Sequence, residues 1–401
     1  MSSVWIAGAA MTAFGRHRDR DLIDLGAEAA MAAMRDAGLT IHDVGLLAVG
    51  NAYEASGMVA QRLLKQIGQT GIEAYNVFNA CATGASAVRI AHLAIEAGQV
   101  DVALVVGVEQ MGKMGMLGAA NKARGDKRVF EPAGRFGAVI GTEGVLGTGL
   151  MPGVFAQAGT DYARRHGVTF EQFAKVAVKN HAHSVLNPLA QYRTKYSLDE
   201  ITSAEMIAYP NTVLMCCPTG DGAAALLLVS ERRRAAMDPA QRERSVKIAA
   251  SVLTTDPYTP TGHAQPDINT LTRDAARRAY ERAGVGPDDL DLVELHDCFA
   301  TAELLHYDNL GLCEPGGAGD FIDSGAPWRD GRLPVNVSGG LISKGHPIGA
   351  TGVAGLYEVA THLRGEAGDR QVDGATVGLA HVIGLGSACG VHILERAALG
   401  S

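Results

Sequence analysis

The sequence predicts an α/β protein made of two related halves, each of which alternates strands and helices. The segments 30–51 and 275–297 both read as a helical pattern, a glycine stop, an Asp-containing turn and an apolar strand. An Ala-Gly pair ends the helix in each segment, and Gly50 corresponds to His296 at the same offset of 246 residues. Repeated units of this kind favour two mostly parallel sheets with helices on their faces.

The correspondence continues in order along the chain. VWIAGAA at the N-terminus resembles VKIAASV at 246–252, NVFNACATGASAVRIAHLA resembles the region from 336, and VDVALVVGVE resembles ATVGLAHVIGLG from 375. The stretch between the halves is less repetitive and contains helical patterns. We therefore predict an N-terminal half at 1–117, an inserted loop domain with a return strand at 118–242, and a C-terminal half at 243–401.

Composition indicates a globular protein and excludes several classes. The chain has 401 residues, of which 47% are hydrophobic and 19% charged, enough for two or three packed units. A net charge of -8 without a dense basic cluster argues against nucleic-acid binding. No apolar run approaches the ~20 residues of a membrane span. The six cysteines form no CxxC pair and no signal peptide is evident, so we expect a cytoplasmic protein with free thiols.

Cys81 stands where an apolar strand runs into a helix rich in small residues, in the sequence NACATGASAV. We expect the helix N-terminus to lower the pKa of this thiol and to offer unpaired N–H groups to an anion. Both effects suit a nucleophile, and the Cys81 N–H could itself serve an oxyanion. The alternative is a buried, inert cysteine.

His346 occupies the corresponding turn of the second half, in SGGLISKGHPIGATG. If the halves are related by a pseudo-twofold axis, the two turns approach, and a histidine beside a thiol can act as its base. A core histidine in a glycine-rich turn is the alternative. His296 and Cys298, in HDCF, lie on one side of an extended segment, where a thiol can move protons and an imidazole N–H can stabilise an oxyanion. Zinc binding by this pair competes with that interpretation.

The C-terminal turn HVIGLGSACG is too weak a pattern for a dinucleotide site, but Gly384 could bring a backbone N–H to an oxyanion. Cys389 fits the interior of a strand. Cys216 and Cys217 are adjacent and are interpreted as structural residues.

Taken together, NACATG, GHPIGATG, CCPTGDGAA and the glycine-rich C-terminal turn resemble the thiolase superfamily along nearly the whole chain. HDCF and GGLISKGHP are closest to the sterol-carrier-protein type of thiolase. The resemblance implies βαβαβαββ halves in a five-layered αβαβα architecture with an inserted loop domain. It also implies an acyltransferase of lipid metabolism, such as fatty acid beta-oxidation, with coenzyme A as co-substrate and no bound cofactor or metal.

The resemblance assigns a role to each site residue. Cys81 attacks the keto carbon of a 3-oxoacyl-CoA, and His346 accepts its proton. His296 and His346 hold the thioester oxygen, while Cys298 protonates the departing enolate and later deprotonates CoA. The N–H groups of Cys81 and Gly384 hold the tetrahedral oxyanion.

One position departs from the family pattern. Most thiolases carry a catalytic cysteine two residues before the C-terminal glycine, and this chain has Val382 there. The resemblance therefore places the second acid/base role on Cys298 alone. Candidate cations for the CoA phosphates come from the inserted region, although ordinary solvated charges are the favoured explanation for them: Lys122, Arg124, Lys127 and Arg128.

Two other functions remain open from the sequence. One is a thiolase-like carbon–carbon lyase, a retro-aldolase acting on a steroid- or aromatic-acyl-CoA without the cysteines. The other is a non-catalytic acyl-CoA- or lipid-binding protein. The family further implies a homodimer or dimer of dimers, and some relatives require a small partner with a zinc ribbon and an OB-fold.

Overall fold

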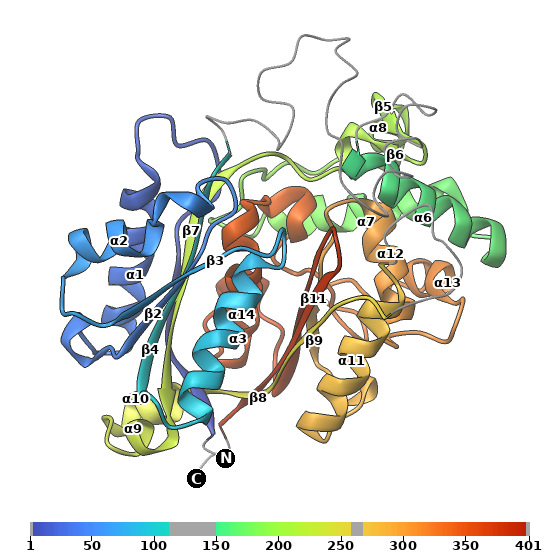
Figure 1. Cartoon of the computed structure of the whole chain (residues 1–401). Coiled ribbons are helices and arrows are strands. Elements are labelled where there is room, and N and C mark those ends of the chain that lie inside the picture. Colours follow the sequence, from blue (N-terminus) through green and yellow to red (C-terminus); the bar gives the residue numbers. More distant parts are fainter. Residues whose placement is uncertain (1–2, 112–149, 258–267, 398–401) are drawn as a thin grey trace.

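The computed structural model describes residues 3–111, 150–257 and 268–397 (Figure 1). Within them, one mixed sheet contains nine strands in the order β3-β2-β4-β7-β1-β8-β11-β10-β9. These strands are β1 (Val4–Met11), β2 (Leu46–Gly50), β3 (Glu73–Val77), β4 (Val102–Gln110), β7 (Asp221–Ser230), β8 (Val246–Thr254), β9 (Leu292–Glu294), β10 (Val377–Gly384) and β11 (Ala388–Arg396).

The strand order is symmetric about the centre of the sheet, as the sequence repeat predicts. β1 and β8 begin the two halves and pair antiparallel over only two residue pairs. Outward from this seam lie β7, β4 and β2 on one side and β11, β10 and β9 on the other. Beyond β2 comes the parallel strand β3, and beyond β9 an isolated parallel bridge from Val293 to Val335 takes the equivalent place.

Helices cover both halves of the sheet and also separate them. α1 (Leu22–Asp36) and α2 (Val59–Ile67) pack on the outer face of the first half, and α11 (Thr270–Ala283) and α12 (Ala300–Asn309) on that of the second. α3 (Thr83–Glu96) and α14 (Ile348–Leu363) share one core cluster with strands of both halves, so they form a middle layer. Figure 1 shows α3 and α14 side by side between the two parts of the sheet.

The two middle helices approach closely because small residues line their contact. A Cβ atom on Gly84 would lie 2.9 Å from the carbonyl oxygen of Gly349 and 2.9 Å from the amide nitrogen of Val353. Only glycine allows the backbones to meet at this distance. The contact brings the N-termini of α3 and α14, one from each half, into the same region.

The inserted region contributes a small layer of helices beside the second half. Its described elements are α6 (Leu150–His166), α7 (Phe170–Ser184), α8 (Leu198–Ser203), β5 (Met206–Ala208) and β6 (Asn211–Thr212). The remaining helices are α9 (Glu231–Ala235), α10 (Pro239–Arg244) and α13 (Ala318–Asp323), with a π-helical turn at Gly340–Lys344.

The predicted fold class is confirmed: duplicated α/β halves form five alternating layers, with an insertion between them. The expectation of two mostly parallel sheets is wrong, because pairing of β1 with β8 joins the described strands of both halves into one sheet, in which β1, β7, β8 and β11 pair only antiparallel. The exact domain boundaries remain predictions. Among the described residues, no helix is both long and apolar enough to cross a membrane.

Candidate active site

Cys81 lies in a tight turn between β3 and α3, two residues before the helix begins. Ala80 adopts a left-handed backbone with φ of 48°, an uncommon conformation for a residue with a side chain. The hydroxyl of Thr83 accepts a hydrogen bond from the Asn79 N–H at 2.8 Å and donates one to the Ala80 carbonyl, so it closes this turn. The turn holds Cys81 fixed and 7% exposed at the end of the middle layer.

The expected lowering of the Cys81 pKa is wrong. Burial raises the pKa of this thiol to about 12 and outweighs the opposing hydrogen bond from the backbone of Leu385; the nearby Glu109 carboxylate raises it further. Desolvation prevails over the helix N-terminus because the thiol is enclosed by apolar groups. Cys81 is therefore a neutral thiol at rest and requires a nearby base.

His346 is the candidate for that base and lies on the facing turn of the second half. It follows the π-helical turn and Gly345, whose φ of 116° is accessible to glycine but strained for other residues. The hydroxyl of Thr351 donates to the carbonyl of Pro347 at 3.0 Å, so it accepts a hydrogen bond from Nδ1–H of His346 at 2.7 Å. This arrangement leaves Nε2 as the free acceptor.

Burial lowers the pKa of His346 to about 3, so its imidazole is neutral and its lone pair is available. Burial also holds the pKa of His296 well below its ordinary value, with the neighbouring His346 adding to the effect. Two neutral imidazoles therefore stand together, and one can accept a proton while the other donates from N–H.

The nucleophile and the two histidines converge. Three side-chain atoms, the sulfur of Cys81 and one ring nitrogen each from His296 and His346, lie within 4.8 Å of one another. All three residues are buried. The rings of His296 and His346 meet edge to face with centroids 5.1 Å apart. A thiol and two imidazoles at this spacing are also potential zinc ligands. This set differs from the His296 and Cys298 pair considered from the sequence.

HDCF is held against the loop that carries His346. The carboxylate of Asp297 accepts hydrogen bonds from the N–H groups of Leu341 at 2.6 Å and Ile342 at 3.2 Å. Asp297 therefore supports the turn, while its neighbours His296 and Cys298 line the cavity. The amide of Asn180 donates to the same carboxylate at 2.8 Å, which ties α7 to this loop.

Glu109, at the end of β4, was not identified from the sequence. Its carboxylate accepts hydrogen bonds from N–H groups of Ala52 at 2.9 Å, Tyr53 at 3.2 Å and Gly349 at 3.1 Å, and from the side chain of Asn51 at 2.9 Å. Burial raises its pKa to about 7, against these donors. Because Gly349 is the second residue of α14 and lies three residues after His346, Glu109 joins the two halves near Cys81 and His346.

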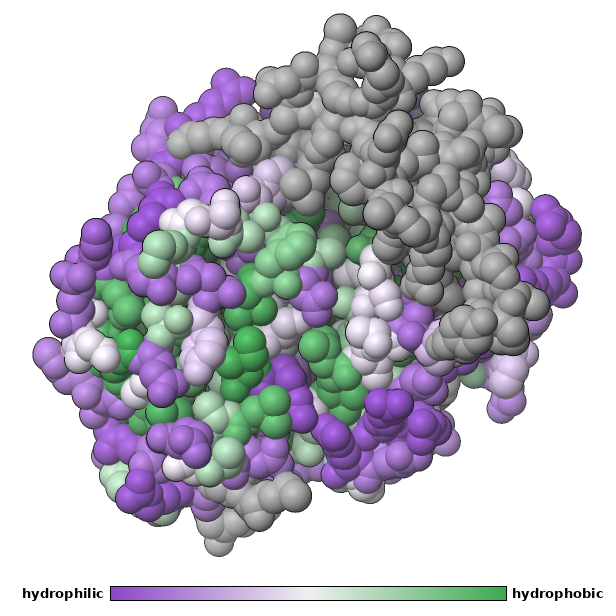
Figure 2. Space-filling view, in the orientation of Figure 1, coloured by the Kyte–Doolittle hydropathy of each residue, from purple (hydrophilic) through white to green (hydrophobic). Residues whose placement is uncertain are grey.

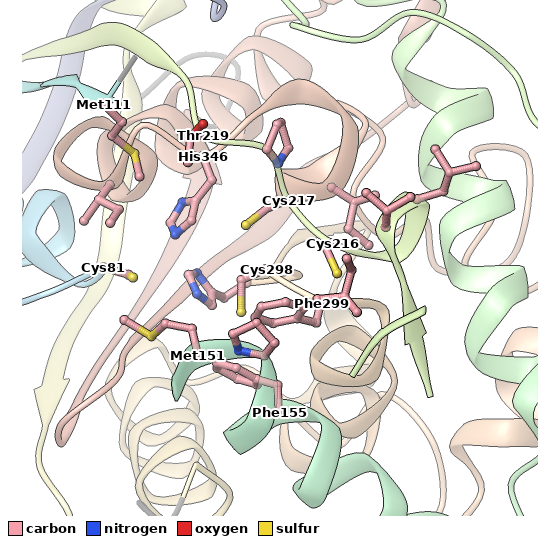
Figure 3. Close-up of a pocket in the computed structure, with 18 of the residues that line it drawn as sticks. Cys81, Met111, Met151, Phe155, Cys216, Cys217, Thr219, Cys298, Phe299 and His346 are labelled. Carbon is pink, nitrogen blue, oxygen red and sulfur yellow. The ribbon is translucent and has the colours of Figure 1, made fainter. Parts of the chain in front are cut away.

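The four predicted side chains line one cavity of about 510 Å³ (Figure 3). Cys81 and His346 lie on one side of it, and Cys298 lies between them and a mainly apolar wall. That wall includes Met151, Phe155, Tyr196, Leu214 and Phe299. Such a lining suits an apolar acyl group next to a small polar reaction centre.

The end of β10 packs against the turn that carries Cys81, while the oxyanion role of the Gly384 N–H stays a prediction. A Cβ atom at Gly384 would lie 2.6 Å from the carbonyl oxygen of Asn79 and 3.1 Å from the amide nitrogen of Ala82. No side chain fits there, so the backbone of this strand end packs directly against the nucleophile's turn. Leu385, the next residue, directs its backbone hydrogen bond to the Cys81 sulfur.

The interpretation of Cys217 as purely structural needs correction, because Cys216 and Cys217 both line the cavity. The local sequence does not indicate that these cysteines reach the cavity, because their position depends on a long-range antiparallel bridge between Cys216 and Phe299. The four cations considered for CoA phosphates lie at 122–128, outside the described residues.

Comparisons with known proteins agree with this geometry. The thiolase N-terminal domain matches residues 4–201, and the thiolase C-terminal domain-like family matches residues 259–396. Sterol carrier protein 2 of Bos taurus is 39% identical over 98% of this chain and 72% of its own length. An acetyl-CoA acetyltransferase of Methanothermobacter thermautotrophicus is 34% identical over 99% of this chain and 100% of its own.

Among solved structures, the Ltp2-ChsH2(DUF35) aldolase has a TM-score of 0.80 at 24% identity and covers 98% of both chains. This likeness concerns the fold. The matched families, the identities to full-length relatives and the shared architecture together show that the chain belongs to the thiolase family.

Proposed function

We propose that this protein is a thiolase-type acyltransferase that cleaves a 3-oxoacyl-CoA with free CoA through an acyl-enzyme on Cys81. The observation that carries the proposal is the convergence of Cys81, His296 and His346 within 4.8 Å in a buried cavity. A thiol, a base with a free nitrogen and a second imidazole are the groups that acyl transfer requires.

In the first half-reaction, the thiol of Cys81 attacks the keto carbon while Nε2 of His346 takes its proton. The new C–S bond forms as the bond between the keto carbon and the α-carbon breaks. His296 and His346 stabilise the negative oxygen of the departing acetyl-CoA enolate, and Cys298 protonates its carbon. The N–H groups of Cys81 and Gly384 hold the tetrahedral oxyanion.

In the second half-reaction, free CoA serves as the co-substrate. The Cys298 thiolate takes the proton of the CoA thiol, whose sulfur then attacks the thioester on Cys81. The products are an acyl-CoA shortened by two carbons and a free Cys81 thiol, which regains its proton from the imidazolium of His346. The reverse sequence is a Claisen condensation. No step draws on a bound metal or cofactor.

The test is the dependence of cleavage on free CoA. A straight-chain 3-oxoacyl-CoA is incubated with the purified chain, with and without CoA, and its loss is followed by liquid chromatography. Multiple turnovers with CoA, and at most one equivalent cleaved without it, are expected. Full cleavage of the matching 3-hydroxyacyl-CoA without CoA, with the 3-oxoacyl-CoA left intact, would instead identify a retro-aldolase, the second candidate suggested by the structural likeness to an aldolase.

A third possibility is a non-catalytic acyl-CoA- or lipid-binding protein. It predicts no loss of substrate under either condition and a Cys81 that reacts with iodoacetamide no faster than the other buried cysteines. Using the chain alone also tests whether a second protein, such as a small zinc-ribbon and OB-fold subunit, is needed for turnover.

We propose further that the chain forms a homodimer, or a dimer of dimers, through the edge strand β3. Within the described residues, β3 has a neighbour on one side only. Tyr75, Phe78 and Leu93, on and near β3 and α3, are exposed apolar side chains. Figure 2 shows apolar side chains gathered down the middle of this face. Light scattering of the purified protein measures the mass of the assembly.

A further inference from the structure

Three thiols, rather than two, face the reaction centre. Cys217 lines the same cavity as Cys81 and Cys298. Figure 3 shows its side chain directed toward the space that His346 and Cys298 border. The thiolase mechanism proposed above gives roles to Cys81 and Cys298 and leaves Cys217 without one.

Cys217 and Cys298 are opposite one another on adjacent chain segments. Cys216 and Phe299 form an isolated antiparallel bridge, so the next pair along is Cys217 and Cys298. The N–H of Cys217 donates to the carbonyl of Cys298 at 2.9 Å. Side chains at directly opposed positions of an antiparallel pair lie on the same face with Cβ atoms about 5 Å apart. The side chains of Cys217 and Cys298 therefore lie on the same face at opposed positions, and both line the cavity.

The proposed chemistry creates a buried anion next to Cys217. When Cys298 gives its proton to the enolate carbon, a thiolate is left in a cavity where burial already raises the pKa of Cys298 well above its ordinary value. His296 and His346 line the same cavity and hold the enolate oxygen in the proposed mechanism. The acidic groups whose charges act on the Cys298 thiol are Cys217, Cys81, Asp297 and Cys216. An unsolvated thiolate there needs a hydrogen-bond donor.

Of these four acidic groups, only one has a hydrogen to donate once Cys298 has become a thiolate. Cys81 carries the acyl group, and the carboxylate of Asp297 is an acceptor already bound by the N–H groups of Leu341 and Ile342. The thiol of Cys216 donates to the carbonyl of Thr212 at 3.2 Å. Within the described residues, the sulfhydryl of Cys217 donates to no other residue.

We propose that Cys217 donates an S–H hydrogen bond to the Cys298 thiolate and holds it until CoA returns a proton. Cys217 keeps its own hydrogen throughout: the proton lost by Cys298 goes to the enolate carbon, and the proton regained comes from the CoA thiol. This inference rests on the proposed function and assigns a positioning residue within the same site.

The test separates the two half-reactions. Cys217→Ala removes the donor, Cys217→Ser keeps one, and Cys313→Ala is the matched control because Cys313 is a free cysteine that does not line the cavity. Acylation of Cys81 is followed by intact mass spectrometry without CoA, and deacylation is followed after CoA is added, across a range of pH. Loss of a hydrogen bond to a charged group changes a rate or equilibrium constant by roughly ten- to a hundredfold.

We expect Cys217→Ala to acylate like the wild-type protein, to deacylate about ten- to a hundredfold more slowly, and to need a higher pH for deacylation. Cys217→Ser should recover most of the rate, and Cys313→Ala should match the wild-type protein. Equal deacylation in all variants, or equal losses in both half-reactions, would overturn the role of Cys217. Failure of the wild-type protein to acylate would instead refute the proposed function itself.

Discussion

The contact between α3 and α14 sets the distance between Cys81 and His346, and Gly84→Ala tests it. The added Cβ would lie 2.9 Å from two backbone atoms of α14, whereas ordinary contacts begin at 3.4 Å, so the helices must separate by about half an ångström. Overpacking of this kind costs ~1–3 kcal/mol of unfolding free energy. A 1 Å misplacement of reacting groups can cost ~100-fold in rate, so half of that predicts about a tenfold loss.

Gly355→Ala, on α14, is the matched control. Its Cβ would meet only Ala380 Cβ, at an ordinary 3.8 Å. Because Gly355 is inside the helix, alanine should stabilise the protein by up to ~1 kcal/mol. Chemical denaturation gives the free energy of unfolding, and the acylation rate of Cys81 gives the functional effect. If Gly84→Ala resembles Gly355→Ala in both, the close helix contact does not position the two residues.

The remaining predictions concern other residues of the site. Cys298→Ala should leave Cys81 acylation measurable but abolish most turnover, and normal turnover would refute its acid/base role. His296→Ala should lower kcat about 100- to 1,000-fold in steady-state assays, as expected for an oxyanion donor; an unchanged kcat would exclude that role. The pKa of Glu109 is raised from 4.5 to about 7 in the folded protein, so the free energy of unfolding should fall as pH rises through that interval. Glu109→Gln should flatten this dependence in denaturation experiments, and an identical slope would contradict the assignment.

Much of the architecture could be predicted because the duplication is visible in the sequence. The correspondence of Gly50 with His296 placed β2 and β9 at equivalent positions, and the sheet order confirms it. Cys81 and His346 follow equivalent strands, so symmetry alone predicted that their turns would approach. That prediction needed only local patterns and one assumption about how the halves face each other.

The residues that were missed depend on contacts between distant segments. Cys217 becomes relevant only because the segment before β7 bridges to the segment after β9, some eighty residues later. In the sequence, Glu109 is only a polar residue at the end of an apolar strand. Its place in the site comes from the hydrogen-bond donors of residues 51–53 and 349, which bind its carboxylate. The expected direction of the Cys81 pKa shift was wrong for a related reason. Burial is a property of the assembled core, whereas the helix start is a local feature.

The central claim is that a thiol from one half is activated by an imidazole from the other. The most direct measurement is intact mass spectrometry after mixing the protein with a 3-oxoacyl-CoA in the absence of free CoA, followed by mapping of the modified peptide. The account predicts one acyl group on Cys81 in the wild-type protein and greatly slowed acylation in His346→Ala. An acyl group on another residue, or acylation of His346→Ala at the wild-type rate, would contradict it.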